Sequence, residues 1–118
     1  MVLNGAQPLV QAGLLGEAID AGPALVFVAD EEMRFLAVNE AACSALGYGR
    51  EELLGLRVSD VAVGPSVEED YAAMVATGEA VGRSELICSD GSRLTVDYRA
   101  SRVTVAQLTM YVSVGFLV

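Results

Sequence analysis

Apolar and polar positions alternate in blocks that predict two neighbouring strands near the start of the chain. The run from Ala24 to Ala29 is almost continuously apolar and contains β-branched and aromatic side chains, which is typical of a strand covered on both faces. Three acidic residues at positions 30–32 interrupt it, and a second apolar run extends from Arg34 to Val38. Two such runs joined by a short polar turn favour an antiparallel hairpin.

A short helix is predicted directly after this hairpin. Asn39 is a suitable N-cap because its side-chain oxygen can accept a hydrogen bond from a free N–H of the first turn. Glu40 in that turn complements the positive end of the helix dipole. Gly47 suits a left-handed C-terminal cap, so the helix is expected to end there.

The order and spacing of these residues resemble those of PAS domains. The resemblance rests on Asp30, Asn39, the pair Gly47-Tyr48, the segment REELLG at 50–55 and the turn Asp90-Gly91. It covers about residues 21–118 and implies an α+β fold, in which helices are inserted between strands 2 and 3 of a five-stranded antiparallel sheet. We therefore expect a sensory domain of a bacterial signalling protein at residues 21–118, preceded by a tail and an amphipathic capping helix at residues 1–20.

The leading helix is expected over Leu9–Ala21, after a loose tail at residues 1–7. Its apolar residues fall near one stripe, and Pro8 suits the first helical position. In PAS proteins such a helix covers the outer face of the sheet or pairs with a second copy, and both alternatives stay open. The residues proposed for a dimer interface are Val10, Leu14, Leu15 and Ile19 of this stripe, and Tyr111 on the outer sheet face.

Further elements follow from local signals. Ser66 and Glu69 match a capping box that begins a helix ending at Gly78, and the segment 56–63 before it is ambiguous between loop and helical turn. Strands are expected at 81–89, 94–100 and 108–118, the first two joined at Asp90-Gly91. In the last strand we place Met110, Val112, Val114 and Phe116 toward the core, and Thr109, Tyr111, Ser113 and Gly115 outside.

Composition bounds the function more than the fold. The 118 residues suffice for one domain, and 53% hydrophobic residues supply its core. Sixteen acidic against seven basic residues give a net charge of −9, which argues against nucleic acid or an anionic membrane as a partner. The sequence has neither a membrane-length apolar run nor the basic start of a signal peptide.

Cys43 and Cys88 lie in apolar segments and are interpreted as reduced core residues of a cytoplasmic protein, with a disulfide or redox pair as the alternative.

The sequence lacks a catalytic constellation, so we do not expect an enzyme. Histidine is absent, which removes the commonest general base and metal ligand. The two cysteines do not form a Cys-x-x-Cys pair, so a metal site is not expected. The paired acids at 31–32, 51–52 and 68–69 stand at turns or helix starts, where solvated carboxylates are favoured anyway.

The resemblance also bears on cofactors, whose identity stays open. Haem-binding PAS domains use a helix histidine, and here Met74 on the corresponding helix is better explained as a core residue. Photoactive flavin domains carry a cysteine at the position that Val58 occupies, and cinnamoyl-type photoreceptors need a cysteine that is absent between Gly55 and Tyr71. Haem and a photoactive flavin are therefore not expected.

What remains is an apolar cavity for a small organic ligand, or an ordinary filled core. The pocket candidates are Phe27, Ala29, Ala42, Leu46, Arg57, Tyr71, Met74, Val75, Tyr98, Met110 and Val112. Ala42 is small enough to leave room for a ligand. Arg57 could pair with a ligand carboxylate or with the nearby Asp60.

Two functions are compatible with these observations. The first is a cytoplasmic sensory domain that binds a small apolar or amphipathic ligand and passes the signal to an effector domain of a longer signalling protein, since the chain stops at the last strand. The second is a ligand-free dimerisation module. A homodimer is expected in both, and the class of effector and the signal stay open.

Overall fold

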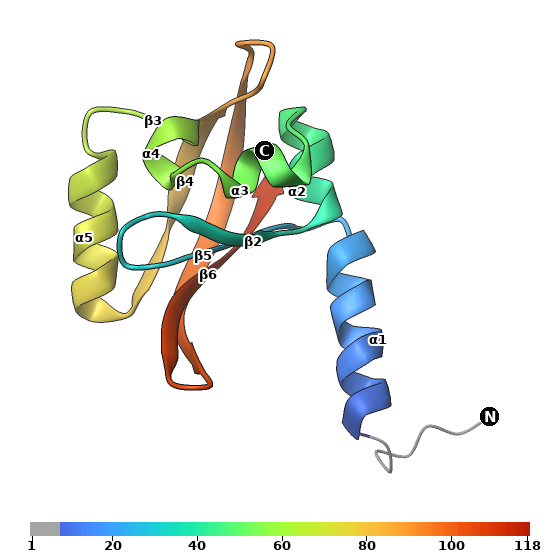
Figure 1. Cartoon of the computed structure of the whole chain (residues 1–118). Helices are drawn as coiled ribbons and strands as arrows, with labels where there is room; N and C mark the ends of the chain where they lie inside the picture. The colour runs from blue at the N-terminus through green and yellow to red at the C-terminus, as the bar shows by residue number, and fades with distance from the viewer. Residues whose placement is uncertain (1–7) are drawn as a thin grey trace.

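The computed structural model describes residues 8–118 as an antiparallel sheet with most of the helices gathered on one face (Figure 1). Within these residues the helices are α1 (Pro8–Ala21), α2 (Glu40–Leu46), α3 (Arg50–Leu54), α4 (Val58–Val61) and α5 (Val67–Thr77). The strands are β1 (Leu25–Ala29), β2 (Phe35–Val38), β3 (Ala62–Val63), β4 (Glu79–Ile87), β5 (Arg93–Val105) and β6 (Leu108–Leu117). The tail expected at residues 1–7 lies outside the described residues.

The sheet has the order β2-β1-β6-β5-β4-β3, with every neighbouring pair antiparallel. Helices α2 to α5 are inserted between β2 and β4, as predicted, and the α+β PAS fold is confirmed. The described part of the chain has six strands rather than the expected five because the ambiguous segment 56–63 contains both a helical turn and a short strand. That strand, β3, pairs with Leu86 and Glu85 of β4.

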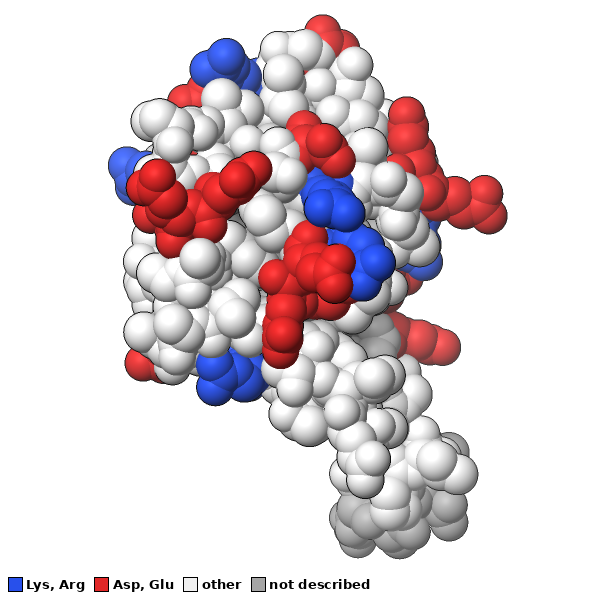
Figure 2. All heavy atoms as spheres, turned by 60° about the vertical axis from the view of Figure 1, so that its left-hand side comes forward, with Lys and Arg blue, Asp and Glu red and all other residues white. Residues whose placement is uncertain are grey.

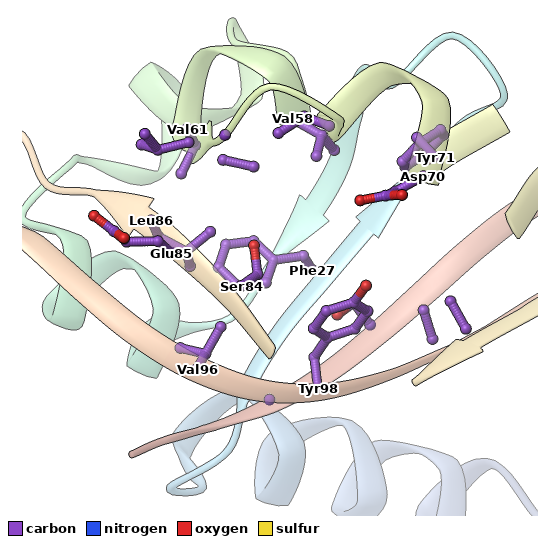
Figure 3. Close-up of a pocket in the computed structure, with 18 of the residues that line it drawn as sticks. Phe27, Val58, Val61, Asp70, Tyr71, Ser84, Glu85, Leu86, Val96 and Tyr98 are labelled. Carbon is purple, nitrogen blue, oxygen red and sulfur yellow. The ribbon is translucent and has the colours of Figure 1, made fainter. Parts of the chain in front are cut away.

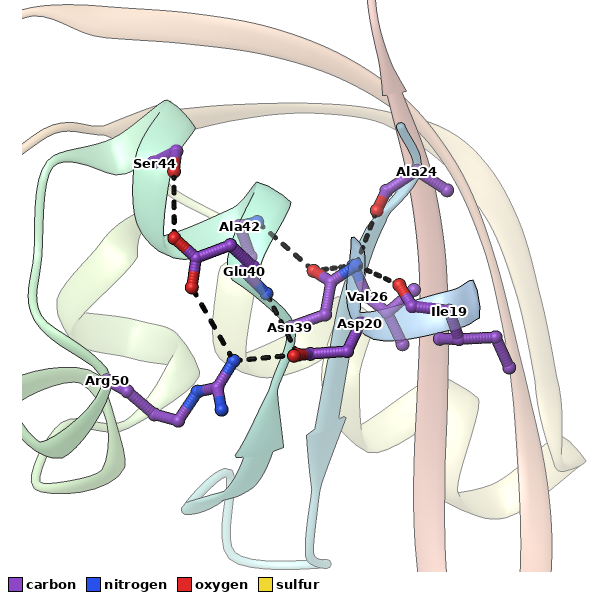
Figure 4. A network of polar contacts seen from close by, with 9 residues as sticks. All are labelled: Ile19, Asp20, Ala24, Val26, Asn39, Glu40, Ala42, Ser44 and Arg50. Atoms are coloured by element: carbon purple, nitrogen blue, oxygen red, sulfur yellow. Dashed lines mark hydrogen bonds and ion pairs between the residues drawn. The ribbon is translucent and has the colours of Figure 1, made fainter. Parts of the chain in front are cut away.

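Asn39 joins three segments of the chain, as Figure 4 shows. Its side chain is the predicted N-cap of α2, accepting from the Ala42 N–H at 3.1 Å, and the same oxygen accepts from the Val26 N–H at 3.0 Å. Its amide nitrogen donates to the carbonyls of Ile19 and Ala24, both at 2.8 Å. The end of α1, the start of β1 and the start of α2 are thus held by one buried amide.

The turn between β1 and β2 is organised by Asp30. Its carboxylate accepts hydrogen bonds from the N–H groups of Glu32 and Arg34 and pairs with the Arg34 guanidinium at 2.8 Å. Burial alone would raise the pKa of Asp30, but the hydrogen bonds from Arg34 and Glu32 outweigh it and the pKa lies below its ordinary value. Met33 adopts a left-handed conformation with φ 70°, which allows the chain to reverse.

Helix α5 begins differently from the predicted capping box. The Ser66 hydroxyl donates to the Asp70 carboxylate at 2.9 Å instead of accepting from the first turn. Its backbone, at φ −113° and ψ 13°, is not in the extended conformation that an N-cap side chain needs. The predicted end is confirmed, since Gly78 has φ 87° and donates to the Met74 carbonyl.

The two faces of β6 are the reverse of those predicted. Tyr111 is 3% exposed and faces the helices, so its assignment to an outer dimer interface is wrong. The register explains this: β6 pairs Ser113 with Ala100 and Gly115 with Tyr98, whose side chains lie on the inner face. Val114 and Phe116 are exposed on the outer face. Sequence hydropathy misled here because the more apolar face of this strand, which carries Met110, Val112, Val114 and Phe116, is the outer one.

Helix α1 projects from the body of the domain beside α2, in dark blue in Figure 1. It buries none of its residues, so it does not cover the outer sheet face. The apolar candidates are all exposed, from 43% for Val10 to 63% for Leu15, with Leu9 at 87%. Its last turn is fixed by Asp20, which accepts from the Glu40 N–H and pairs with Arg50 at 2.7 Å (Figure 4).

Candidate ligand cavity

A cavity of about 500 Å³ lies between the inner face of the sheet and a roof formed by α4, β3 and α5 (Figure 3). Its apolar walls come from β1, β2 and α4, including Phe27, Phe35 and Val61. The rings of Phe27 and Phe35 stand 5.6 Å apart in a tilted arrangement. The cavity is therefore bounded by side chains from five or more elements that are far apart in sequence.

The floor of the cavity is open around Tyr98 because its cross-strand neighbours are glycines. Tyr98 of β5 pairs with Gly82 of β4 and with Gly115 of β6. A Cβ at Gly82 would lie 3.4 Å from the Tyr98 hydroxyl oxygen and 3.5 Å from its ring, so the ring lies across Gly82. A Cβ at Gly115 would lie 3.6 Å from the Tyr98 Cβ, so both glycines leave room for the Tyr98 side chain.

The roof is held by Tyr71 of α5. Its hydroxyl donates to the Asp30 carbonyl at 2.7 Å, and its ring meets the Tyr111 ring edge-on with centroids 6.1 Å apart. Burial, assisted by the charges of Asp30 and Tyr111, raises the pKa of Tyr71 far above its ordinary value. The hydroxyl is therefore protonated at neutral pH and remains a donor.

Arg102 of β5 contacts the C-terminal part of α5. Its guanidinium donates to the Val75 carbonyl, and its N–H donates to the Gly78 carbonyl at 2.7 Å. The guanidinium also lies 5.9 Å from the centroid of the Tyr111 ring, with Nε 3.4 Å from the Tyr111 hydroxyl. A positive group at a helix C-terminus is electrostatically favourable, so Arg102 anchors α5 to the sheet.

Polar groups in the cavity are mainly hydroxyls. Tyr98, Ser84 and Ser113 line it, and burial together with the charge of Asp70 raises the pKa of Tyr98. All three hydroxyls are thus neutral at physiological pH and can donate or accept. This arrangement of apolar walls with a few polar groups is typical of small-molecule sites.

The structure brings five of the predicted pocket residues together at this cavity. They are Phe27, Ala29, Tyr71, Met74 and Tyr98.

Six others do not line it, and their placement there is corrected. Ala42 and Leu46 are fully buried in direct packing of α2 against β1, which leaves no room beside them. Arg57 is exposed, and its N–H donates to the Asp60 carboxylate at 2.8 Å. Val75 packs against the buried cluster of Met74, Ala100 and Tyr111 without lining the cavity. Met110 and Val112 lie away from the cavity because the faces of β6 are reversed.

Several lining residues were missed by sequence analysis. Tyr111 and Gly115 were placed outside, and Ser84 and Asp70 were not considered. The signal that could have identified them is the run of small residues opposite Tyr98 on both neighbouring strands, since a sheet face with glycine and serine around one tyrosine leaves a hollow. Reading it requires the register, which the sequence alone does not supply.

Within residues 8–118 there is no group of three His, Cys, Asp or Glu residues that could hold a metal ion. Cys43 and Cys88 are free, buried and outside the cavity lining. None of the described helices has the length and hydropathy of a membrane span.

Solved structures of similar fold come from several signalling proteins. A PAS domain of a two-component sensor histidine kinase superposes with a TM-score of 0.82 at 17% identity, covering 95% of this chain and 100% of that one. The PAS domain of an HTR-like protein from Haloarcula marismortui superposes with a TM-score of 0.80 at 19% identity, covering 94% of this chain and 95% of that one. A domain of a sensory box sensor histidine kinase/response regulator from Geobacter sulfurreducens superposes with a TM-score of 0.75 at 22% identity, covering 94% of this chain and 97% of that one.

The sequence comparison agrees with these folds. No curated protein sequence matches this chain significantly. The model of the PAS domain family, in contrast, matches residues 23–117, nearly the whole length of the chain. Together with the sheet order and the inserted helices, this match shows that the chain belongs to the PAS domain family.

Proposed function

We propose that this PAS domain is a cytoplasmic sensory module whose cavity binds a small apolar or amphipathic ligand and passes its occupancy to an effector domain. The observation that carries the proposal is the cavity of about 500 Å³, which falls within the range of small-molecule sites, roughly 300–1,000 Å³. Its roof, α5, is joined to the sheet by Tyr71 and Arg102 at separate points, so a ligand beneath it would bear directly on both contacts.

The resident ligand is proposed to be neither haem nor a photoactive flavin. Val58 lines the cavity at the position where the resemblance expects the flavin-reactive cysteine. An organic ligand held by apolar contact and hydroxyl hydrogen bonds is more compatible with the lining residues.

The first experiment is native mass spectrometry of the purified protein together with an absorbance scan. Extra mass that denaturation releases would identify a resident ligand. Calorimetric titration with 1-octanol then measures whether the cavity accepts an added apolar molecule. Bare polypeptide mass combined with no uptake of 1-octanol would contradict the proposed function.

A matched pair of variants locates the binding. Ser113→Leu adds volume at the cavity floor, whereas Ser101→Leu makes the same change on an outward-facing position of the neighbouring strand. We expect Ser113→Leu to abolish uptake and Ser101→Leu to preserve it, with both variants retaining the circular dichroism spectrum of the parent.

The exposed apolar side of α1 favours a second function, self-association. Leu14, Leu15 and Ile19 are each more than two-fifths exposed on a helix that projects from the domain, and such surfaces mark interaction sites. We propose that α1 pairs with α1 of a second copy. Sedimentation velocity of Leu14→Asp, compared with Gln11→Asp on the same helix, tests this: loss of dimer in the first alone supports it, and a monomeric parent protein contradicts it.

A further inference from the structure

The cavity has an uneven charge distribution that the proposed function does not use. Asp70 of α5 lines it, and within residues 8–118 its carboxylate forms no ion pair. Its hydrogen bond comes from the neutral Ser66 hydroxyl, at 2.9 Å. Figure 3 shows the Asp70 carboxylate above the Tyr98 hydroxyl at the same side of the cavity. An unneutralised negative charge therefore stands beside a phenol at the cavity edge.

No basic group compensates this charge. Arg83 is the one basic residue among the described lining residues, and its guanidinium forms two hydrogen bonds with Asp97, at 2.7 and 3.2 Å. Glu85, the other acidic lining residue, is neutralised by Arg93 at 2.9 Å. The local imbalance at Asp70 is thus not cancelled by its neighbours.

The net charge of the whole molecule adds to the negative potential at Asp70. The net charge is −9, and Figure 2 shows acidic side chains distributed over the visible face with fewer basic ones between them. A carboxylate or phosphate ligand would meet repulsion from Asp70 and from the molecule as a whole, with no free cation in the cavity to hold it. A cationic ligand would meet attraction from both.

An ammonium group suits the polar edge of the cavity. The Asp70 carboxylate and the Tyr98 hydroxyl, which lie at the same side of the cavity, can each accept a hydrogen bond from a primary ammonium. The Tyr98 ring adds a π-face near the same point. The apolar remainder of such a ligand would lie against Phe27, Leu25 and Val96.

We infer that the cavity selects an amphipathic amine, with its protonated nitrogen at Asp70 and Tyr98 and its apolar body between the sheet and α4. This inference rests on the proposed ligand-binding function and specifies the charge of the ligand. Of the two roles considered for Arg57, pairing with a ligand carboxylate is set aside, because Arg57 lies outside the cavity and contacts Asp60.

The test compares three probes of equal chain length that differ in charge: octylamine, 1-octanol and octanoate. Calorimetric titration at pH 7.5 and low salt is expected to give the order octylamine, 1-octanol, octanoate from tightest to weakest. In Asp70→Asn the ratio of the affinities for octylamine and 1-octanol should fall by roughly fivefold, which is the contribution of a partly exposed charge pair to binding. Asparagine keeps the hydrogen bond from Ser66, so the fold is expected to be retained.

Glu69→Gln is the matched control, because it removes the same charge from the neighbouring position of α5, which does not line the cavity. It should leave the preference for octylamine unchanged, whereas a preference due only to net charge would fall equally in both variants and overturn the inference. Binding of 1-octanol with octylamine no tighter than octanoate would overturn it too, with the ligand-binding function intact. Failure of all three probes would overturn the ligand-binding function itself.

Discussion

The amide of Asn39 does more than end a strand. It makes two hydrogen bonds as a donor and two as an acceptor while only 4% of the residue is exposed. Only an uncharged amide can supply both kinds of group at this position. Its four partners lie on three segments, so the side chain fixes where α1 leaves the domain.

We expect Asn39→Asp to destabilise the domain by about 3 kcal/mol, because the carboxylate cannot donate to the Ile19 and Ala24 carbonyls and places a charge in a buried site. Urea denaturation at pH 7 measures the change in the free energy of unfolding. Ser44→Ala, which removes an exposed bond to Glu40 in the same helix, is the control and should change it by less than about 0.5 kcal/mol. Equal effects of the two substitutions would contradict the role of Asn39.

Tyr71→Phe tests the contact between α5 and the β1–β2 turn. Removing the hydroxyl leaves the Asp30 carbonyl without this donor, and we expect a loss of about 1 kcal/mol in the free energy of unfolding. Tyr48→Phe removes a longer bond, 3.4 Å to the Ile87 carbonyl, and should cost less. Thermal denaturation of both variants gives the comparison, and a larger effect at Tyr48 would contradict it.

Three helix caps whose partners lie within one helical turn could be predicted from the sequence, whereas the capping box predicted at Ser66 does not form. The caps at Asn39, Gly47 and Gly78 were correct because each depends on backbone groups three or four positions away. Tyr111 could not be placed, because its contacts with Tyr71 and Arg102 depend on three elements meeting.

Among the elements, α5 is the one that joins the cavity to the rest of the domain. It contributes Tyr71, Met74 and Asp70 to the lining, and it contacts the sheet at both ends. The position of α5 along the chain was predicted, but not which face of β6 is buried. Helical spacing is local, whereas the buried face of β6 depends on the register with β5 and is here the less apolar of the two.

Arg102→Met should loosen the C-terminal end of α5. The substitution keeps an apolar stem but removes the donors to the Val75 carbonyl and the charge near the Tyr111 ring. We expect faster amide hydrogen exchange in the last turn of α5 and a loss of about 1–2 kcal/mol in the free energy of unfolding.

Arg99→Met supplies the control on the same strand, because Arg99 is exposed on the opposite face. Exchange in α5 should stay at the parent rate in this variant. If both variants accelerate it equally, general destabilisation of β5 and not the anchor would be responsible.

At the scale of the whole molecule, the family could be predicted from the order and spacing of turn and cap residues such as Asp30, Asn39 and Gly47. The cavity could not be predicted in this way. Its floor is formed where Tyr98 of β5 lies beside Gly115 and Ser113 of β6, so it depends on how the two strands pair. The net charge of the cavity lining depends on which side chains form ion pairs. Arg83 and Glu85 pair with Asp97 and Arg93, whereas Asp70 forms no ion pair with a described residue. The composition gives the net charge of −9 but not how the charges are distributed over the molecule.

That distribution predicts how stability depends on pH. Hydrogen bonds hold the pKa of Asp30, Asp90 and Asp97 below the ordinary value, through Arg34, Ser92 and Arg83 respectively, with burial opposing the shift. A carboxyl with a lowered pKa in the folded state stabilises the fold above its unfolded pKa, near 3.9, and the stabilisation is lost as the pH falls through the folded value. Relief of the −9 self-repulsion acts in the opposite direction until the net charge vanishes near pH 4.2.

The two effects together place the maximum of stability near pH 5, with a steep loss below about pH 4. Urea midpoints measured between pH 7 and pH 3 should show a small rise followed by this fall. Asp30→Asn should be less stable than the parent at pH 7, because it loses the ion pair with Arg34, and the difference should shrink at pH 3, where the parent aspartate is becoming protonated. A difference that stays constant from pH 7 to pH 3 would mean that the carboxylate charge of Asp30 does not stabilise the turn.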